Sequence, residues 1–222
     1  MRILTLAAAA LVAAGHLGAQ TRDFSPYLIA DRAAEVALAR SAAPAHVSDS
    51  ATVLVLTRTG FVEAARGSNG FTCAVLRSFN GAIGDPAFWN PRVRAPHCFN
   101  APAVRTILPE SVKRAEWLLG GASPEEVVER TKRAYASGEL KLPEVGAMAY
   151  MLSPRQHLLD EDPHWKPHMM FYFDRSMPAA TWGVGDMTAP VIDGSAGDRM
   201  LPVQVLLIPV PQWSDGKPAG HR

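Results

Sequence analysis

Two histidines, His164 and His168, lie four residues apart in the segment that is richest in side chains able to do chemistry, directly after an acidic run from Asp160 to Asp162. An imidazole can bind a metal ion or accept a proton near neutral pH. A carboxylate close to an imidazole favours its charged form, and the acidic run makes His164 the second choice for a functional histidine after His168. Pro167 argues against a shared helical face, so we expect His168 to begin a strand. We predict that the two histidines face one ligand-binding cavity.

Aromatic side chains around these histidines are suited to form the walls of such a cavity. Trp165 lies between them in the sequence, and alternation along the predicted strand 168–173 places Tyr172 on the same side as His168. The segments around Trp89 and Trp182 supply further aromatic bulk. Apolar walls with a few polar groups are the usual composition of a small-molecule site. We therefore include Trp165 and Tyr172 among the candidate ligand-binding residues.

A structural interpretation explains the same segment more simply. It treats His168 as a half-buried residue at a strand edge and the acidic run as solvated, because no third ligand or nucleophile is fixed by spacing. We therefore assign no catalytic residue, no metal ion and no cofactor. Three functions stay open: an exported protein that binds a small ligand, a hydrolase or metal-dependent enzyme that uses His164 and His168, and an interaction module of the cell envelope.

The cysteines form an isolated pair. Cys73 and Cys98 are the only cysteines and lie 25 positions apart, without a C-x-x-C motif that would indicate a redox or zinc site. In an exported protein such a pair usually forms a disulfide. The alternative is a reactive thiol at Cys98 beside His97, but adjacent residues of a strand point to opposite sides. We predict a Cys73–Cys98 disulfide and retain His97 as a candidate ligand-binding residue.

Four methionines in the last third of the chain offer a copper site as an alternative. Met148, Met151, Met169 and Met170 carry the soft sulfur ligands that copper(I) prefers. Methionine is more often a filler of the hydrophobic core. Because no spacing between histidine and methionine in this sequence is diagnostic of a copper site, we expect the four methionines to belong to the hydrophobic core.

The N-terminus has the pattern of a signal peptide over residues 1–19. Arg2 supplies the positive charge, an uncharged apolar stretch follows, and small residues such as Gly15 and Ala19 end the segment. The apolar run is shorter than the roughly 20 residues that span a bilayer. We expect cleavage after Ala19, with a position near Gly15 as the alternative. The mature chain, residues 20–222, is then one domain in the periplasm or outside the cell.

The amino-acid composition argues against some classes of protein and of binding partner. Of the 222 residues, 48% are hydrophobic and 19% are charged, which is typical of a globular rather than a disordered chain. Lys and Arg total 22 against 21 Asp and Glu, so the basic excess of a nucleic-acid-binding protein is missing. No second long apolar run follows the leader, and we expect no stable membrane insertion after cleavage.

The elements that must position these residues follow from turn and periodicity signals. Strands are predicted at residues 52–57, 61–66, 71–77, 145–152, 168–173 and 203–208, and the first three form a meander whose second turn contains Asn69-Gly70. Helices are predicted at residues 27–40, 109–119, 124–137 and 153–159. Residues 79–100 have no clear period and are expected to form a loop pinned by the disulfide. Strands grouped between helices indicate an α+β fold, with an antiparallel sheet of about six strands and helices packed on it.

Two segments of the C-terminal third resemble uncharacterised exported bacterial proteins. The first is Trp-Lys-Pro-His-Met-Met-Phe-Tyr at residues 165–172, and the second is Ile-Pro-Val-Pro-Gln-Trp-Ser-Asp-Gly at residues 208–216. The resemblance implies an exported protein. It implies no activity and no catalytic residues.

Overall fold

The structure is a computed structural model that describes residues 22–194 and 202–220. The signal peptide predicted for residues 1–19 lies outside the described part of the chain. Within that part, no helix is both long enough and apolar enough to cross a membrane.

Eight strands form one mixed sheet in the order β2-β1-β3-β4-β5-β6-β8-β7. Their bounds are Thr52–Thr57 (β1), Gly60–Ala65 (β2), Thr72–Leu76 (β3), Ala95–Phe99 (β4), Met148–Met151 (β5), His168–Asp174 (β6), Ile192–Asp193 (β7) and Val203–Pro209 (β8). Neighbouring strands are antiparallel except β1 and β3, which are parallel. The predicted α+β class is therefore confirmed, whereas the prediction of about six strands in a purely antiparallel sheet is wrong.

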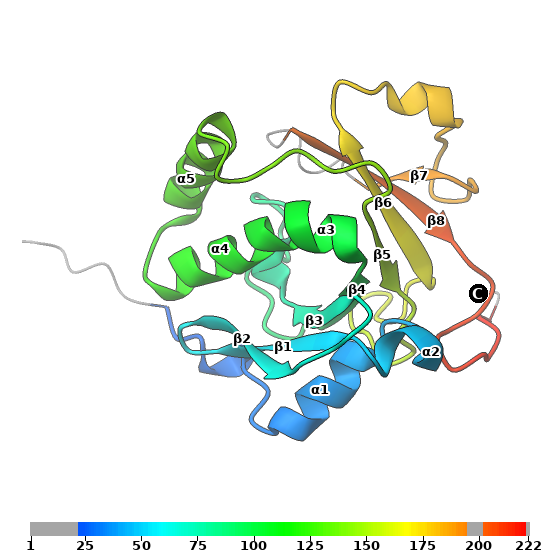
Figure 1. The fold of residues 1–222 in the computed structure, drawn as a ribbon, viewed down its shortest axis with the longest axis horizontal. Helices are drawn as coiled ribbons and strands as arrows, with labels where there is room; N and C mark the ends of the chain where they lie inside the picture. Colours follow the sequence, from blue (N-terminus) through cyan, green and yellow to red (C-terminus); the bar gives the residue numbers. More distant parts are fainter. Residues whose placement is uncertain (1–21, 195–201, 221–222) are drawn as a thin grey trace, which may run out of the picture.

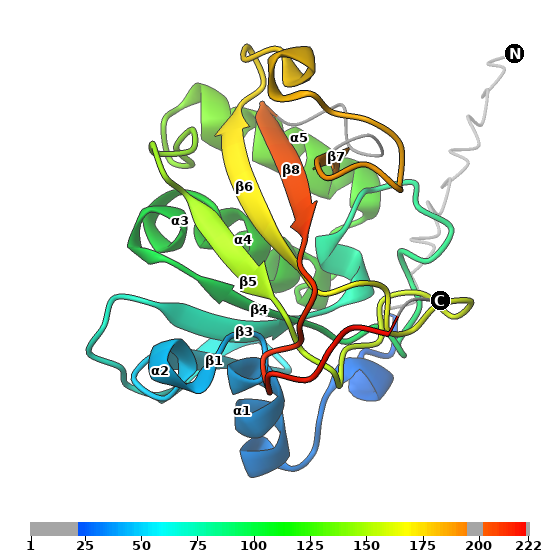
Figure 2. The same cartoon turned by 90° about the vertical axis from the view of Figure 1, so that its right-hand side faces the viewer.

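Helices cover both faces of this sheet (Figure 1). Their bounds are Arg32–Arg40 (α1), Ala45–Ser48 (α2), Ala101–Thr106 (α3), Leu108–Leu119 (α4) and Pro124–Ala136 (α5), and short 3-10 helices occupy Ser25–Tyr27, Ser78–Asn80 and Ala179–Trp182. In Figure 1, α1 and α4 lie on opposite sides of β1 and β3. Figure 2 shows β5, β6 and β8 with α3, α4 and α5 behind them. We call the side of the sheet that carries α3 and α4 the helical face.

Each face has its own hydrophobic core. On the helical face, Ala74, Leu76 and Phe99 of the sheet pack with Ile107 and Leu108 at the junction of α3 and α4. On the opposite face, the alanine-rich stripe of α1 packs against the other side of β1, β3 and β4. Because successive residues of a strand point to opposite faces, alternate residues of a strand contribute to different cores. This alternation, or parity, decides which candidate side chains share a face.

Helix starts follow the capping residues. Ser123 and Glu126 form the predicted capping box at the start of α5. The first long helix begins later than predicted, because the Asp31 carboxylate accepts hydrogen bonds from Ala33 N and Ala34 N. The helix predicted for residues 153–159 is wrong: the structure has a turn at its start, in which Ser153 Oγ accepts from the backbone N–H of Arg155 at 3.1 Å.

The predicted meander is wrong at β3. After the β1–β2 hairpin the chain crosses the start of β1, and β3 then pairs with β1 in parallel. Gly67 permits this crossing, because a Cβ on that residue would lie 2.2 Å from Thr52 N. Ser68 N donates to Ser50 O at 2.8 Å, and the Asn69 side chain donates to Val47 O at 2.7 Å, which holds the crossing in place. The Asn-Gly pair therefore belongs to a crossover rather than to a hairpin.

β4 is a central strand inside the segment that we predicted to be a loop. It pairs antiparallel with β3 along its whole length, but with β5 only through Cys98 and Phe99. Pro96, which cannot donate a ladder hydrogen bond, lies beyond the pairing with β5 and is tolerated there. The loop that precedes β4 is held by Phe79 and Phe88, which are buried between α4, α5 and the N-terminal 3-10 helix.

The predicted disulfide is confirmed. Cys73 of β3 lies directly opposite Cys98 of β4, the two residues are bonded, and both are fully buried beneath α1. The bond joins two strands that the ladder already pairs, so it fixes their register. It leaves no free thiol for the reactive pair with His97 that the sequence left open.

Replacing both cysteines with alanine is expected to lower the free energy of unfolding by about 3.5 kcal/mol. This is the chain-entropy estimate for closing a loop of this length. The measurement is denaturant unfolding of the double variant and of the oxidised wild type. Wild type kept in a reducing agent should move toward the variant, and equal unfolding midpoints for variant and oxidised wild type would contradict the expectation.

Candidate functional site

An open groove lies on the helical face of the sheet. It consists of two adjacent hollows of about 180 Å³ and 250 Å³, and both are lined by Leu76, Asn80, Gly81, His97 and Met170. Tyr172 lines only the smaller hollow, and Leu158 lines only the larger one. We call them the Tyr172 hollow and the Leu158 hollow, and the two together the His97 groove.

Strand parity brings the floor of this groove together. His97 of β4 lies on the same face as Phe99, while β6 places Met170 and Tyr172 on that face through its pairing with β5. Ala149 of β5 and Ala147 just before it lie on the same face, between the larger side chains of β4 and β6.

A wall of the groove is fastened to α4 by hydrogen bonds. The Asn80 side chain donates to Ser111 O at 2.9 Å, and Arg114 Nη2 donates to Gly81 O at 2.5 Å. The backbone N–H of Arg77 in turn donates to Asn80 Oδ1 at 3.1 Å. These contacts hold the turn after β3 against α4, so the opening has a defined shape.

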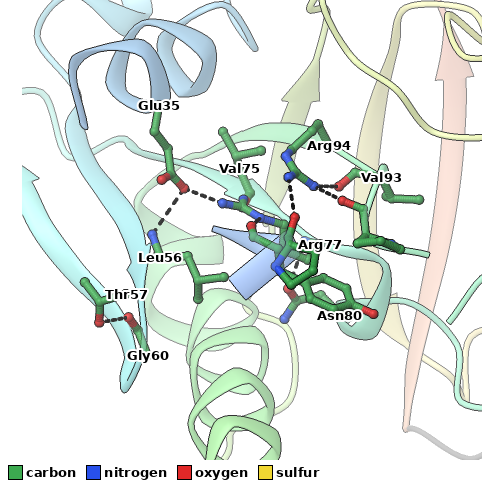
Figure 3. Close-up of polar contacts among 12 residues, drawn as sticks. Glu35, Leu56, Thr57, Gly60, Val75, Arg77, Asn80, Val93 and Arg94 are labelled. Atoms are coloured by element: carbon green, nitrogen blue, oxygen red, sulfur yellow. Dashed lines mark hydrogen bonds and ion pairs between the residues drawn. The ribbon is translucent and has the colours of Figure 1, made fainter. Parts of the chain in front are cut away.

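A buried ion pair supports this turn from the other side (Figure 3). Arg77 Nη2 donates to Glu35 Oε1 at 2.7 Å, and both side chains are about 1% exposed or less. The same carboxylate oxygen accepts from Leu56 N at 3.1 Å, and Arg77 also donates to the carbonyls of Tyr27 and Val75. Burial lowers the pKa of Arg77, and the Glu35 carboxylate opposes that shift. Each of the three guanidinium nitrogens thus donates to a buried acceptor, and Glu35 compensates the charge.

Arg94 lies beside this pair in Figure 3. Burial, followed by the nearby positive charge of Arg77, lowers the pKa of Arg94 to about 10. Its guanidinium donates to the carbonyls of Val93 at 2.8 Å and Pro26 at 3.2 Å, and to the carbonyl of Pro91. These contacts fasten the loop before β4 to the N-terminal segment, which is a structural role.

His97 is the most unusual polar group of the groove. Its side chain is stacked on Phe99, the residue is 6% exposed, and its Nδ1 lies 2.8 Å from Ala95 O. A carbonyl only accepts, so Nδ1 carries the proton and Nε2 is left as an acceptor. Burial lowers the pKa of His97 to about 4, which keeps the ring neutral at neutral pH. Among the described residues none donates a hydrogen bond to Nε2.

Besides Asn80 and Ser111, the Tyr172 hollow is lined by Tyr172, Glu110 and Arg114, whose polar groups have complementary properties. Tyr172 is 5% exposed, and burial, followed by the charge of Glu110, raises the pKa of its hydroxyl. Among the described residues, the acceptor of that hydroxyl is the weakly accepting Sδ of Met170, at 3.5 Å. Glu110 and Arg114 of α4 form an ion pair at 3.1 Å. The hollow thus combines an O–H donor, an imidazole acceptor and a paired carboxylate and guanidinium.

His168 lies on the same face but outside this cavity lining. It is 2% exposed, its Nδ1 donates to Lys166 O at 2.8 Å, and its ring contacts Trp165 edge-on at 4.7 Å between centroids. Burial lowers its pKa to about 4. Met151 pairs with His168 and, by extension of the β4–β5 register, lies between it and His97. Two strand spacings, roughly 9.5 Å, therefore separate the histidine backbones.

The structure does not bring His164 and His168 into one cavity. His164 is exposed and lines a separate hollow of about 350 Å³ with Asp162, Lys166 and Trp213. The other aromatic candidates are also dispersed: Trp89 lies under the Arg22 guanidinium, and Trp182 packs on Phe173. Of the five predicted site residues, His97 and Tyr172 share a cavity, while Trp165 and His168 contact each other outside its lining.

Metal ligands do not converge in the described residues. The described residues contain no group of three or more His, Cys, Asp or Glu side chains that is able to hold a metal ion. The methionines divide by parity: Met151 and Met170 lie on the helical face with His97 and His168, whereas Met148 and Met169 lie on the opposite face. The four sulfurs of the copper hypothesis are thus split between two sides of the sheet.

Sequence reasoning missed the residues that α4 and the preceding turn contribute to the groove, namely Asn80, Glu110, Ser111 and Arg114. The spacing of Glu110 and Arg114 is the i, i+4 spacing of a helical ion pair, but most such pairs are only surface features. In comparisons with known proteins, no family model matches this chain, and neither a curated protein nor a solved structure matches it.

Proposed function

We propose that this protein binds a small, uncharged, mainly apolar molecule in the His97 groove. The observation that carries the proposal is Nε2 of His97, an acceptor on a residue that lines both hollows, for which the described residues supply no donor. A ligand that donates a hydrogen bond to this nitrogen would gain about 0.5–1.5 kcal/mol. The remaining lining is mostly apolar, as in other small-molecule sites.

Charge in the groove favours an uncharged ligand. His97 and Tyr172 are neutral at neutral pH because burial disfavours their charged forms. Glu110 and Arg114 compensate each other. Among the described residues that line the Tyr172 hollow, a ligand with a net charge would therefore meet charges that are already paired.

A hydrolase finds less support in this geometry. A histidine base acts on a nucleophile within hydrogen-bond distance, and its second nitrogen is commonly oriented by a carboxylate. In the described part of the chain, His97 Nε2 has no such nucleophile, and Nδ1 donates to a main-chain carbonyl. Binding without chemistry is the function that these contacts favour.

We propose further that the protein acts outside the cytoplasm, in the periplasm or as a secreted protein. The predicted leader supports this location. The buried Cys73–Cys98 disulfide also supports it, since such bonds persist mainly in oxidising compartments.

A titration with the uncharged dye Nile red tests the binding proposal. We expect saturable fluorescence enhancement with one dye per chain. Ala82→Trp, which fills the Tyr172 hollow, and Ala87→Trp, which fills the Leu158 hollow, should each weaken binding by roughly tenfold or more. Ala136→Trp at the exposed end of α5 is the control and should bind as wild type does. Absence of saturable binding, or equal binding by all three variants, would overturn the proposal.

A further inference from the structure

The two hollows of the His97 groove differ in polarity along its length. The Tyr172 hollow has Ser111, Glu110 and Arg114 of α4 on one side and Tyr172 of the sheet opposite them. The Leu158 hollow contains Ser78 and Asn80, but aliphatic side chains make up most of its own lining: Ala87, Val93, Ala95, Leu158 and Leu159. His97 and Met170 lie where the two meet. A ligand that fills both hollows must therefore be polar at one end and apolar at the other.

The charged residues of the Leu158 hollow do not change this division. Arg77 lines it, but the Arg77 side chain is 0% exposed and its guanidinium is committed to Glu35 and to backbone carbonyls. Asp85 is exposed at the rim, where its carboxylate accepts from Ala87 N at 2.7 Å. The charge of Arg77 is therefore compensated by Glu35, and the Asp85 carboxylate lies at the exposed rim of the hollow.

The polar end calls for a group that both donates and accepts a hydrogen bond. His97 Nε2 is an acceptor, and the Tyr172 hydroxyl is a donor whose acceptor, in the part of the chain that the structure describes, is the thioether sulfur of Met170. An alcohol matches both, since its O–H donates to the imidazole while its oxygen accepts from the phenol. A carboxylate offers His97 no proton, and an ammonium cannot accept from Tyr172, while Glu110 and Arg114 are ion-paired with each other.

We propose that the ligand is a neutral aliphatic alcohol, with its hydroxyl between His97 and Tyr172 and its hydrocarbon chain in the Leu158 hollow. This inference rests on the proposed function and specifies the ligand class and orientation for the same groove. The hydroxyl head gives specificity, and the apolar chain gives most of the affinity because its burial scales with chain length.

Calorimetric titration with octanol, octanoate and octylammonium tests the head group. We expect octanol to bind at least about tenfold more tightly than either charged analogue, the factor that one or two hydrogen bonds supply. His97→Leu and Tyr172→Phe should each weaken octanol binding about fivefold, whereas Ala136→Trp, at the exposed end of α5, should bind octanol as wild type does. Melting temperatures of both variants verify that they are folded. Octanoate or octylammonium binding as tightly as octanol would overturn the inference.

Chain length tests the orientation. Leu158→Ala should weaken octanol binding severalfold but leave butanol binding unchanged, because a short chain does not reach the far end of the Leu158 hollow. Equal losses of affinity for octanol and butanol would contradict the assigned orientation. If Nile red binds saturably but the three octyl compounds do not differ, the groove binds ligands and only the alcohol assignment fails. If Nile red does not bind either, the proposed function itself fails.

Discussion

Replacing Arg77 with methionine is expected to lower the free energy of unfolding by about 3–5 kcal/mol. That is the usual cost of removing one partner of a buried ion pair, because the remaining charge is left without compensation. Here the remaining charge is Glu35, which is 1% exposed and would keep only the backbone N–H of Leu56 as a donor. The carbonyls of Tyr27 and Val75 would lose their donors at the same time.

Urea unfolding of Arg77→Met, Glu35→Gln and the double variant measures this effect. The double variant should lose less stability than the sum of the single losses, since both charges are then absent. Lys132→Met is the matched control, because the Lys132–Glu129 pair lies on the surface with both side chains more than half exposed, and its midpoint should stay at the wild-type value. A loss below about 1 kcal/mol for Arg77→Met would show that the pair does not hold the turn after β3.

Local sequence signals predicted correctly those elements whose own residues favour the conformation that the fold gives them. The β-branched run of β1 predicts a strand, and the capping box of α5 predicts the start of a helix. The structure has both the strand and the helix. β4 could not be found this way, because Pro96 and His97 interrupt the pattern and the strand is held by its antiparallel pairing with β3. The parallel pairing of β3 with β1 depends on the close approach of Gly67 to the backbone at the start of β1. This is a tertiary contact, and local turn rules cannot predict it.

The candidate site shows the same limit. Strand alternation correctly aligned His168 with Met170 and Tyr172, because parity is a property of the strand alone. It did not reveal that Met151 separates His168 from His97, since this requires the order of β4, β5 and β6 in the sheet. Nor did it place His164, whose loop packs near the C-terminal segment around Trp213. The wall contributed by α4 arises from hydrogen bonds such as that from Asn80 to Ser111 O, across 31 residues of sequence.

Acidification is expected to destabilise the protein between pH 6.5 and about 4, the interval between the ordinary histidine pKa and the lowered pKa of His97 and His168. In this interval the unfolded chain binds a proton at each of these histidines and the folded chain does not. Stability therefore rises with pH through the interval, and it falls as pH decreases toward 4. Each histidine contributes up to about 1.4 kcal/mol per pH unit, or roughly 3 kcal/mol across the interval.

Urea unfolding at several pH values across this interval, for wild type and His97→Gln, measures the slope. The variant removes one of the two buried imidazoles, so its free energy of unfolding should fall less steeply, by about 1.4 kcal/mol per pH unit. His46→Gln is the control, because that side chain is exposed on α2, and it should keep the wild-type slope. Parallel curves for wild type and His97→Gln would mean that the His97 imidazole accepts a proton in the folded state as readily as in the unfolded state. The ring would then be positively charged in mildly acidic solution, and its Nε2 would be a donor rather than the acceptor that binding of an alcohol requires.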